Sequence, residues 1–308
     1  MKIVKKILKV LVIIVCIIII LLILNHIRLN IHYLINKSHY KEVYNVQGNK
    51  DKYIPQGLTY SSKYNIAIQT SYNKKHKVSR IYITNLNNNK LIKTLDLLKD
   101  NNRINNNHVG GVTTDNNTVW ITSDYEVNEY SLEQIINTNK KSIKSIRDTK
   151  LPIRGDFCLY KNDTLYIGDF FLNPFYKVPN NNPLLLAYKD TNYNNPNYII
   201  SLPKMVQGME ITKDNHFLFT TSFTYLINSN LLEYNNVLLE KPSTYKLNND
   251  KIPYYKFTNK NLIKKTKIAP MAEGMYYKNN KLHILFESSS DAYTPALPKM
   301  KKVIIFEK

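Results

Sequence analysis

Five stretches of the chain share one pattern, and this repeat restricts the fold more than any other feature of the sequence. In each stretch a glycine opens a run of alternating apolar residues, a polar turn follows, and a second apolar run ends in small polar or acidic residues. The stretches begin near Pro55, Val109, Ile153, Val206 and Ala272, and their glycines are Gly57, Gly111, Gly155, Gly208 and Gly274. Alternating apolar residues on both sides of a short polar turn predict a β-hairpin in each repeat.

Further strand-like runs follow these hairpins, so that each repeat holds about four strands. The first hairpin is followed by "RIYITNL" and "KLIKTLDL", the second by "VNEYSL", and the third by "PFYKVP" and "NYIISL". Four-stranded units that recur about every 40 to 50 residues are typical of β-propellers. The sequence therefore predicts an all-β fold, a β-propeller of five four-stranded blades.

The two ends of the predicted propeller complement each other. The last repeat has room for only three strands and ends in "KKVIIFEK", whereas the segment Glu42–Val46 reads as an isolated strand. We expect this early strand to complete the last blade and close the ring, which places the propeller domain at residues 42–308. The long interval that contains Leu226–Phe257 leaves room for a sixth, degenerate blade as the alternative.

The repeated glycines have a structural explanation. The innermost strands of a propeller crowd around its axis, where a side chain would meet the neighbouring blade. We therefore expect each of the five glycines at the start of an innermost strand.

The N-terminus is the most apolar part of the chain. Val10–Leu24 is unbroken apolar sequence, and Ile7 and Leu8 extend it to the roughly 20 residues that cross a bilayer. No small-x-small site follows, which favours an uncleaved anchor over a signal peptide. Lysines precede the apolar run, so the positive-inside rule puts the N-terminus in the cytoplasm and the propeller outside. The expected segments are a basic cytoplasmic tail (1–6), a transmembrane signal-anchor helix (7–27) and a linker or juxtamembrane helix (28–41).

The formal net charge of +20 favours acidic partners such as anionic lipids or an anionic envelope polymer. The lysines are scattered over predicted loops and match no nucleic-acid-binding motif, so no nucleic-acid partner is expected. Cys16 lies in the apolar run and Cys158 in a distant predicted strand, which argues against a disulfide. We expect Cys158 and Trp120 in the core.

The residues that precede the glycines are mostly polar, which packing alone does not explain. Because the innermost strands run in parallel around the axis, these side chains should converge at one mouth of the channel, and the second strands return to that mouth. The predicted ligand-binding set is Gln56, His108, Arg154, Gln207, Glu273, Glu287, Asp124 and Asp169. A ring of convergent polar groups in a concave place is the usual form of a ligand site.

Two carboxylates of this set come from one hairpin. Glu273 and Glu287 repel each other when ionised unless a cation or Arg154 lies between them. Ca²⁺ binds several oxygen ligands, so these two residues are the candidate metal ligands and Ca²⁺ the candidate cofactor. Glu273 and His108 are the candidate catalytic residues. In the alternative, Arg154 neutralises the acids as a structural partner, and the loop Ser288–Met300 is either a lid over the mouth or a crossover.

The hairpins "QGL…TSY" and "EGM…LFESS" resemble those of secreted bacterial and archaeal propellers with no assigned activity. They are similar, more distantly, to the gluconolactonase and paraoxonase propellers, in which an inner-strand Glu-Gly supplies a ligand to a channel Ca²⁺. Glu273–Gly274 matches that motif, but that family has six blades and its Asn and Asp ligands have no counterparts here. Five-bladed arabinan-cleaving enzymes carry an acid where this chain has Gln56, so that resemblance ranks lower.

The sequence leaves two classes of function open. It contains no nucleophile elbow, P-loop or zincin motif. The first class is a non-catalytic, membrane-tethered propeller that binds a small ligand, an envelope polymer or a partner protein at the channel mouth. The second is a lactonase- or esterase-like hydrolase in which channel Ca²⁺ polarises a carbonyl group. Metal dependence and the loss of activity in Glu273→Gln would distinguish the second from the first.

Overall fold

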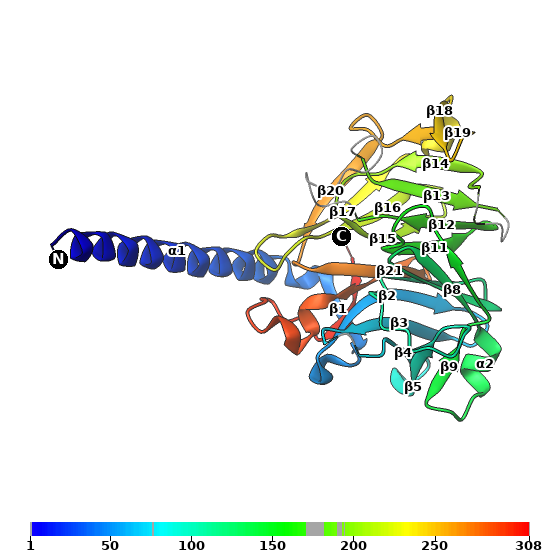
Figure 1. Ribbon diagram of the computed structural model, residues 1–308, viewed down its shortest axis with the longest axis horizontal. Coiled ribbons are helices and arrows are strands. Elements are labelled where there is room, and N and C mark those ends of the chain that lie inside the picture. Colours follow the sequence, from blue (N-terminus) through cyan, green and yellow to red (C-terminus); the bar gives the residue numbers. More distant parts are fainter. Residues whose placement is uncertain (1, 76, 171–181, 190–192, 194, 308) are drawn as a thin grey trace.

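Five β-sheets surround one axis in the computed structural model, and a long helix precedes them (Figure 1). The structure describes residues 2–75, 77–170, 182–189, 193 and 195–307. The helix, α1 (Lys2–Ile35), projects from the propeller as a single rod. The predicted all-β propeller of five four-stranded blades is confirmed.

The first two blades follow one another along the chain. Blade 1 consists of β2 (Tyr53–Ser61), β3 (Ile66–Asn73), β4 (Arg80–Asn85) and β5 (Lys90–Leu98), with β9 (Ser142–Lys144) added in parallel at its outer edge. Blade 2 consists of β6 (Gly111–Thr114), β7 (Thr118–Ser123), β8 (Glu126–Ser131) and β10 (Arg147–Lys150). The short helix α2 (Leu132–Asn137) lies between β8 and β9, and the Ser131 hydroxyl caps it by accepting a hydrogen bond from the Gln134 N–H.

The remaining blades repeat this plan. Blade 3 consists of β11 (Phe157–Lys161), β12 (Thr164–Gly168), β13 (Leu184–Tyr188) and β14 (Tyr198–Ser201), and blade 4 of β15 (Val206–Ile211), β16 (Phe217–Thr221), β17 (Ser229–Tyr234) and β20 (Leu262–Ile268). Blade 5 consists of β21 (Ala272–Lys278), β22 (Lys281–Phe286), β23 (Lys302–Phe306) and β1 (Tyr40–Asn45). Short 3₁₀ helices are η1 (Lys37–His39), η2 (Asn49–Asp51), η4 (Val237–Leu239), η5 (Glu287–Ser289) and η6 (Asp291–Tyr293).

The ring closes between the two ends of the domain. The innermost strands β2, β6, β11, β15 and β21 each contact the next, and β21 contacts β2. In blade 5 the early strand β1 pairs with the last strand β23, for example Glu42 with Ile304. This pairing confirms the predicted closure, which begins at Tyr40, two residues earlier than predicted.

The alternative of a sixth blade within Leu226–Phe257 is wrong. Part of this segment forms β17 of blade 4, and the remainder forms the hairpin of β18 (Ser243–Leu247) and β19 (Asp250–Lys256). Strand β19 runs parallel to β14, so the hairpin widens the sheet of blade 3. The ring of innermost strands is already complete with five members, which leaves this hairpin only an outer edge to join.

In blade 3, the predicted strand "PFYKVP" lies outside the described residues. The third strand of this blade is β13, a fully apolar and buried run that the sequence pattern had not indicated.

Four of the five glycines lie in innermost strands as predicted, although only Gly111 begins its strand. A Cβ atom on Gly274 would clash with the Leu58 nitrogen, and one on Gly111 would lie 2.5 Å from the Cys158 nitrogen. Gly57 and Gly208 also lie close to the main chain of their neighbouring strands, so main chain meets main chain around the axis.

The prediction is wrong for Gly155, which precedes β11. Blade 3 begins with Phe157, and its cross-strand partner is Gly168. A Cβ atom on Gly168 would clash with the Phe157 ring. In blade 3 the aromatic side chain occupies the innermost strand and the glycine has moved to the second strand.

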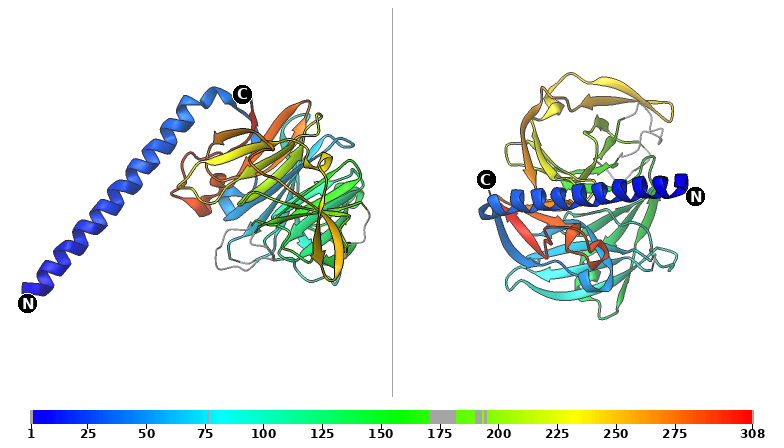
Figure 2. Two further views of the ribbon diagram at one scale, coloured as in Figure 1. Left: turned by 90° about the horizontal axis from the view of Figure 1, so that it is seen from above. Right: turned by 90° about the vertical axis from the view of Figure 1, so that its left-hand side faces the viewer.

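Helix α1 has two parts. Its apolar N-terminal part is not covered by the propeller and is long enough to cross a membrane. Its C-terminal part packs against the domain, where Leu29 is buried and Asn25 Nδ2 donates a hydrogen bond to the Leu226 carbonyl at 2.7 Å. Figure 2 shows the helix leaving the propeller at an oblique angle. Most of the segment expected as a linker is therefore a continuation of α1, followed by η1.

The core lies between neighbouring blades, where apolar side chains of facing sheets form five clusters. Cys158 and Trp120 are buried in one of them, as predicted. The Trp120 indole N–H donates a hydrogen bond to the Tyr193 hydroxyl at 3.0 Å. Cys16 is exposed on α1, far along the chain from Cys158, and both cysteines are free.

Candidate functional site

Three innermost strands carry a β-bulge at the residues that precede their glycines. The pairing register shifts between Pro55 and Leu58 in β2, between Val206 and Gly208 in β15, and between Ala272 and Met275 in β21. A bulge adds a residue to one strand and redirects its side chain. The bulged residues are Gln56 with Gly57, Gln207 alone, and Glu273 with Gly274, which explains why polar side chains recur at this place.

Gln56 and Glu287 join the first and last blades at the channel mouth. Gln56 is only 2% exposed, and its Nε2 donates a hydrogen bond to Glu287 Oε1. Burial raises the pKa of Glu287 to about 7, although its hydrogen bonds with Gln56 and Tyr293 oppose the rise. Glu287 is thus a carboxyl group that titrates near neutral pH.

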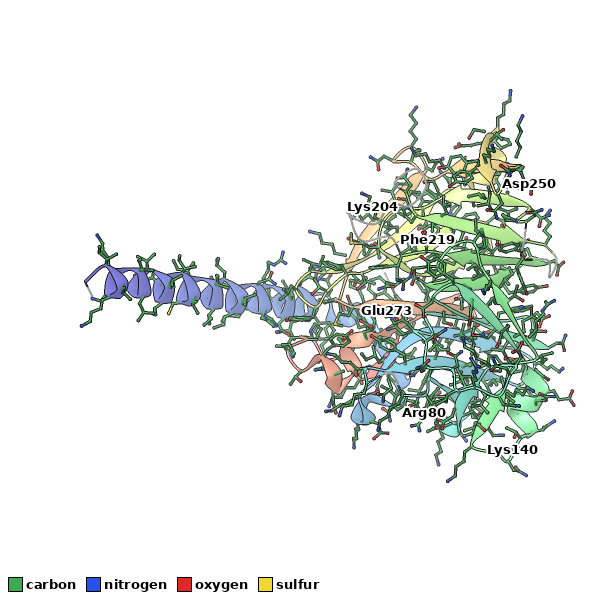
Figure 3. The ribbon with its side chains drawn as sticks, viewed as in Figure 1. Arg80, Lys140, Lys204, Phe219, Asp250 and Glu273 are labelled. Carbon is green, nitrogen blue, oxygen red and sulfur yellow. The ribbon has the colours of Figure 1, made fainter. Side chains whose placement is uncertain are left out.

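Glu273 is the most unusual side chain of the mouth. It is the second residue of β21 and is 2% exposed. Figure 3 shows its place in the propeller. Its Oε1 atom has no hydrogen-bond partner. Burial raises the pKa of Glu273 well above its usual range, and the negative charges of Glu287 and Asp156 raise it further. A buried carboxyl oxygen without a partner is costly for the fold and is rarely retained without a use.

Two tyrosines lie beside this pair of carboxyls, and a histidine packs against one of them. The rings of Tyr72 and His108 lie 4.4 Å apart between centroids. The Tyr293 hydroxyl interacts with both Tyr72 and Glu287. Tyr293 belongs to the loop Ser288–Met300, which joins β22 to β23 and also covers the carboxyls with this side chain. The loop is therefore the crossover between β22 and β23, and its Tyr293 side chain forms part of the candidate site.

His108 precedes β6, and its Nδ1 atom is buried without a hydrogen-bond partner. Burial lowers the pKa of His108, and the positive charge of Arg154 lowers it further, while Asp156 and Asp124 oppose the shift. The imidazole is therefore neutral at pH 7, because its usual pKa is about 6.5.

Arg154 organises a second group of charges at the same mouth. Its Nη2 atom lies 3.1 Å from Asp156 Oδ1 and 3.7 Å from Asp124 Oδ1, whereas its Nε atom is buried without a partner. Asp156 Oδ2 also accepts a hydrogen bond from the Phe170 N–H at 2.8 Å. Arg154 thus partly neutralises two carboxyls but does not reach the Glu273–Glu287 pair.

Asp169 lies beside this group and has a structural bond of its own. Its Oδ1 accepts a hydrogen bond from the Leu184 N–H at 2.8 Å, at the start of β13. Burial raises the pKa of Asp169 to about 7; the Leu184 N–H and Arg154 oppose the rise, and Asp156 adds to it.

Gln207, the remaining predicted residue, is partly exposed at the mouth in β15. Below it, the axis is closed: the cavity between Gly57, Gly111, Gly208 and their neighbours has a volume of about 10 Å³. That is room for about one water molecule. The site therefore lies at one end of the axis, and the packed innermost strands close the axis below it.

The structure brings the predicted residues together in two groups. Gln56, Glu273 and Glu287 form the first group with Tyr72 and Tyr293, and Arg154, Asp124 and Asp169 form the second with Asp156. His108 links the two groups, because its ring contacts Tyr72 and its charge interactions are with Asp156, Arg154 and Asp124. The sequence pattern did not indicate Tyr72 and Tyr293 as members, and it left open which way the Asp156 side chain points. Tyr72 directly follows the small polar residues that end the first repeat. This position next to the predicted mouth was the sequence signal that could have identified it.

The mouth can accept hydrogen bonds or positive charge at Glu273 and Glu287, and it can donate from Arg154 Nε. Within the described ranges, no three His, Cys, Asp or Glu side chains lie close enough together to hold a metal ion. Glu273 and Glu287 alone would supply side-chain oxygens to a cation between them, and the remaining ligands would have to be other oxygens.

No family model matches the sequence, and no curated protein matches it. Among solved structures, the chain is similar to a Myxococcus xanthus glutaminyl cyclase, with 9% identity over 79% of this chain and 88% of that chain and a TM-score of 0.48. It is also similar to the PQQ-bound aldose sugar dehydrogenase of Streptomyces coelicolor, with 11% identity over 80% and 76% of the two chains and a TM-score of 0.44. At these identities and scores, the similarities carry no argument about what this chain binds.

Proposed function

We propose that the protein is a membrane-anchored propeller that binds a small ligand at the mouth around Glu273 without catalysing a reaction. The ligand carries a positively charged, hydrogen-bond-donating group, such as a primary amine. The observation that supports this proposal most is the Glu273 Oε1 atom, which is buried and has no partner. A donor from a ligand would satisfy it.

The charge at the mouth supports a cationic ligand. Although the whole chain has a formal charge of +20, the only Arg or Lys that pairs with the acids of the mouth is Arg154 among the described residues. The acids are Glu273, Glu287, Asp124, Asp156 and Asp169. A cation would offset the burial that raises the pKa of both Glu273 and Glu287, and at Glu273 also the repulsion by Glu287. An anionic envelope polymer, in contrast, fits the exposed lysines of the surface and not this mouth.

The aromatic side chains around the carboxyls support the same ligand. Tyr72 and Tyr293 lie beside Glu287, His108 packs against Tyr72, and the faces of such rings attract cations. Since Glu273 Oε1 is inaccessible to water, a ligand reaches it only when a neighbouring side chain moves. Tyr293 belongs to a loop and not to a blade strand, so it is the neighbour that the sheets hold least firmly.

The anchor sets the compartment of the propeller. The helix is long and apolar enough to span a membrane, and four lysines lie at or before the start of its apolar run: Lys2, Lys5, Lys6 and Lys9. The positive-inside rule therefore supports a cytoplasmic N-terminus and an extracytoplasmic propeller.

A calcium-dependent hydrolase is the second candidate. Glu287 supports it, because a carboxyl with a pKa of about 7 is suited to act as a general base at neutral pH. In this account Glu273 would bind Ca²⁺, which would polarise a carbonyl group of the substrate.

One series of melting temperatures tests both candidates. The full chain in an uncharged polyoxyethylene detergent is mixed with n-butylamine, n-butanol, sodium butyrate or calcium chloride at pH 8. At about 100 times the dissociation constant, n-butylamine should stabilise the fold by roughly 2.7 kcal/mol and raise the Tm by about 5 to 10 °C. Butanol and butyrate have the same chain without the cation and should have no such effect.

Glu273→Gln should abolish the effect of n-butylamine. Glu210→Gln is the matched control, since Glu210 is also buried in an innermost strand but accepts hydrogen bonds from the Ile211 and Tyr277 N–H groups. It should keep the response. A rise with calcium alone that Glu273→Gln removes would favour the hydrolase, and no response to any of the four compounds would count against binding at this mouth.

A further inference from the structure

The position of α1 relates the propeller to the membrane plane. Its C-terminal part lies along the outside of the domain, with Tyr33 packed against Tyr40 at the start of β1. Because β1 pairs with β23 antiparallel, Tyr40 lies beside Phe306, at the end of blade 5 opposite to the mouth. At Asn25 and His26, by contrast, the helix contacts the Leu226 and Pro295 carbonyls, in the loops at the mouth end. The helix therefore passes the mouth end of the propeller as its apolar part begins.

Exposed apolar side chains gather on the same loops. Phe223 is 50% exposed, Ile227 43% and Leu297 39%. They lie in the β16–β17 and β22–β23 connections, which are the two loops that α1 contacts. Such side chains next to a membrane helix are costly in water and favourable in the lipid interface.

Leu297 also borders an apolar groove against the helix. The groove has a volume of about 380 Å³ and is lined by Leu297 and by one side of α1: Ile19, Leu22, Ile23 and Ile27, with His26 and Asn30 at the polar end. Since these helix residues belong to the stretch suited to a bilayer, Leu297 lies at the level where lipid begins.

The charge of this end of the propeller fits an anionic lipid surface. Exposed lysines outnumber exposed acids in the loops of blades 1, 4 and 5 at the mouth end; the lysines include Lys74, Lys75, Lys77, Lys204 and Lys301, and the acids are Asp51, Asp100 and Asp291. Lysines near the membrane surface attract anionic headgroups.

We infer that the propeller lies on the bilayer with its Glu273-bearing mouth towards the lipid, and that Phe223, Ile227 and Leu297 enter the headgroup region. The mouth then opens towards the membrane surface, and the opposite end, where η4 follows β17, points away from it. This inference rests on the membrane anchorage proposed above. It does not depend on which ligand the mouth binds.

Tryptophan quenching by lipid tests this orientation. The full chain is reconstituted in vesicles of phosphatidylcholine and phosphatidylglycerol with bromine on the acyl chains. Phe223→Trp and Leu297→Trp are compared with Leu239→Trp, which lies in η4 at the opposite end and is 86% exposed. The wild type carries only the buried Trp120 and gives the background. We expect Phe223→Trp and Leu297→Trp to lose several-fold more emission than Leu239→Trp.

Two controls keep the outcomes distinct. Flotation of the vesicles shows whether the chain is anchored at all, so a chain that does not float contradicts the anchorage and not merely the orientation. Anchored protein in which Phe223→Trp and Leu297→Trp are quenched no more than Leu239→Trp overturns the inference. If Phe223→Trp does not fold, as judged by its melting temperature, Ile227→Trp replaces it in the same comparison.

Discussion

Gln56 in β2 donates a hydrogen bond to the carboxylate of Glu287, 231 positions later in the sequence, and thereby connects the first blade to the last at the channel mouth. Two other features of the site depend on the same junction. Gly274 packs against the main chain of Leu58, and Glu273 lies beside Glu287. Closure of the ring and assembly of the candidate site are therefore one structural event.

Glu273→Gln should stabilise the protein at pH 8. The folded-state pKa of Glu273 is raised, so the folded protein loses stability as the pH rises above the unfolded pKa of about 4.5. Glutamine cannot ionise, so we expect a gain in the free energy of unfolding at pH 8 that disappears as the pH falls to about 4.5. Urea unfolding at pH 8 measures it. A clear loss of stability would show that the carboxylate has a partner that holds it.

Glu210→Gln should have the opposite effect. Burial also raises the pKa of Glu210, but both of its oxygens accept main-chain hydrogen bonds, and Lys161 lies 3.5 Å away. Glutamine has one acceptor oxygen, so one buried N–H group loses its partner at a cost of about 1 to 3 kcal/mol. The same urea experiment compares the two variants, and an equal response of both would contradict the distinction between them.

Asp169→Asn should flatten the pH dependence of stability. The pKa of Asp169 rises from 3.8 to about 7 on folding, so its contribution is lost progressively as the pH rises from about 4 to 7. The loss should be of order 4 kcal/mol, and asparagine retains an oxygen for the Leu184 N–H. Unfolding free energies of the wild type and Asp169→Asn, measured from pH 4 to pH 8, test this prediction. Equal slopes of stability against pH in the two proteins would contradict it. The slopes that come from Glu273 and Glu287 should remain.

Gly274→Ala should destabilise the ring closure. The added Cβ would clash with the Leu58 nitrogen, which is main chain and cannot move alone, so we expect a cost of about 1 to 3 kcal/mol or more. Gly168→Ala meets a side chain instead, the Phe157 ring. A second change, Phe157→Leu, should recover part of the loss at Gly168. Thermal unfolding of the three variants shows whether the added methyl group is opposed by main chain or by a side chain. No recovery in the double variant would contradict a side-chain clash at Gly168.

Removal of β1 should unfold blade 5 or the whole ring. A chain that begins at residue 37 retains the β1–β23 pairing, whereas one that begins at residue 47 leaves the edge of β23 open. Both lack α1, so the comparison isolates the closing strand. We expect a cooperative transition in the first and an earlier transition with aggregation in the second. Equal melting temperatures would mean that the closure contributes little.

The repeat made the fold predictable, because turns and alternating apolar runs are local signals. Even the closure by β1 could be predicted, from one strand missing at one end and one extra at the other. The sixth blade was wrong because a local strand pattern does not show which sheet a hairpin joins. Gly155 was wrong because a large and a small residue can exchange places across a strand pair, as Phe157 and Gly168 do.

The site was predictable only in part. The acids and amides of the repeat could be placed at one mouth, since their spacing follows that of the blades. Tyr293 could not, because its position depends on the path of a loop, and the conformation of a loop is not periodic. The lack of a partner at Glu273 is likewise a property of three-dimensional packing.

The protonation state of Glu273 tests the account most directly. Infrared difference spectra of the full chain, wild type against Glu273→Gln, would show the carbonyl stretch of this carboxyl group. At pH 7 we expect the band of a protonated carboxyl, which n-butylamine should convert into that of a carboxylate as the amine binds. A carboxylate band at pH 7 without any amine would mean that Glu273 already has a charged partner, and the proposed binding site would then be wrong.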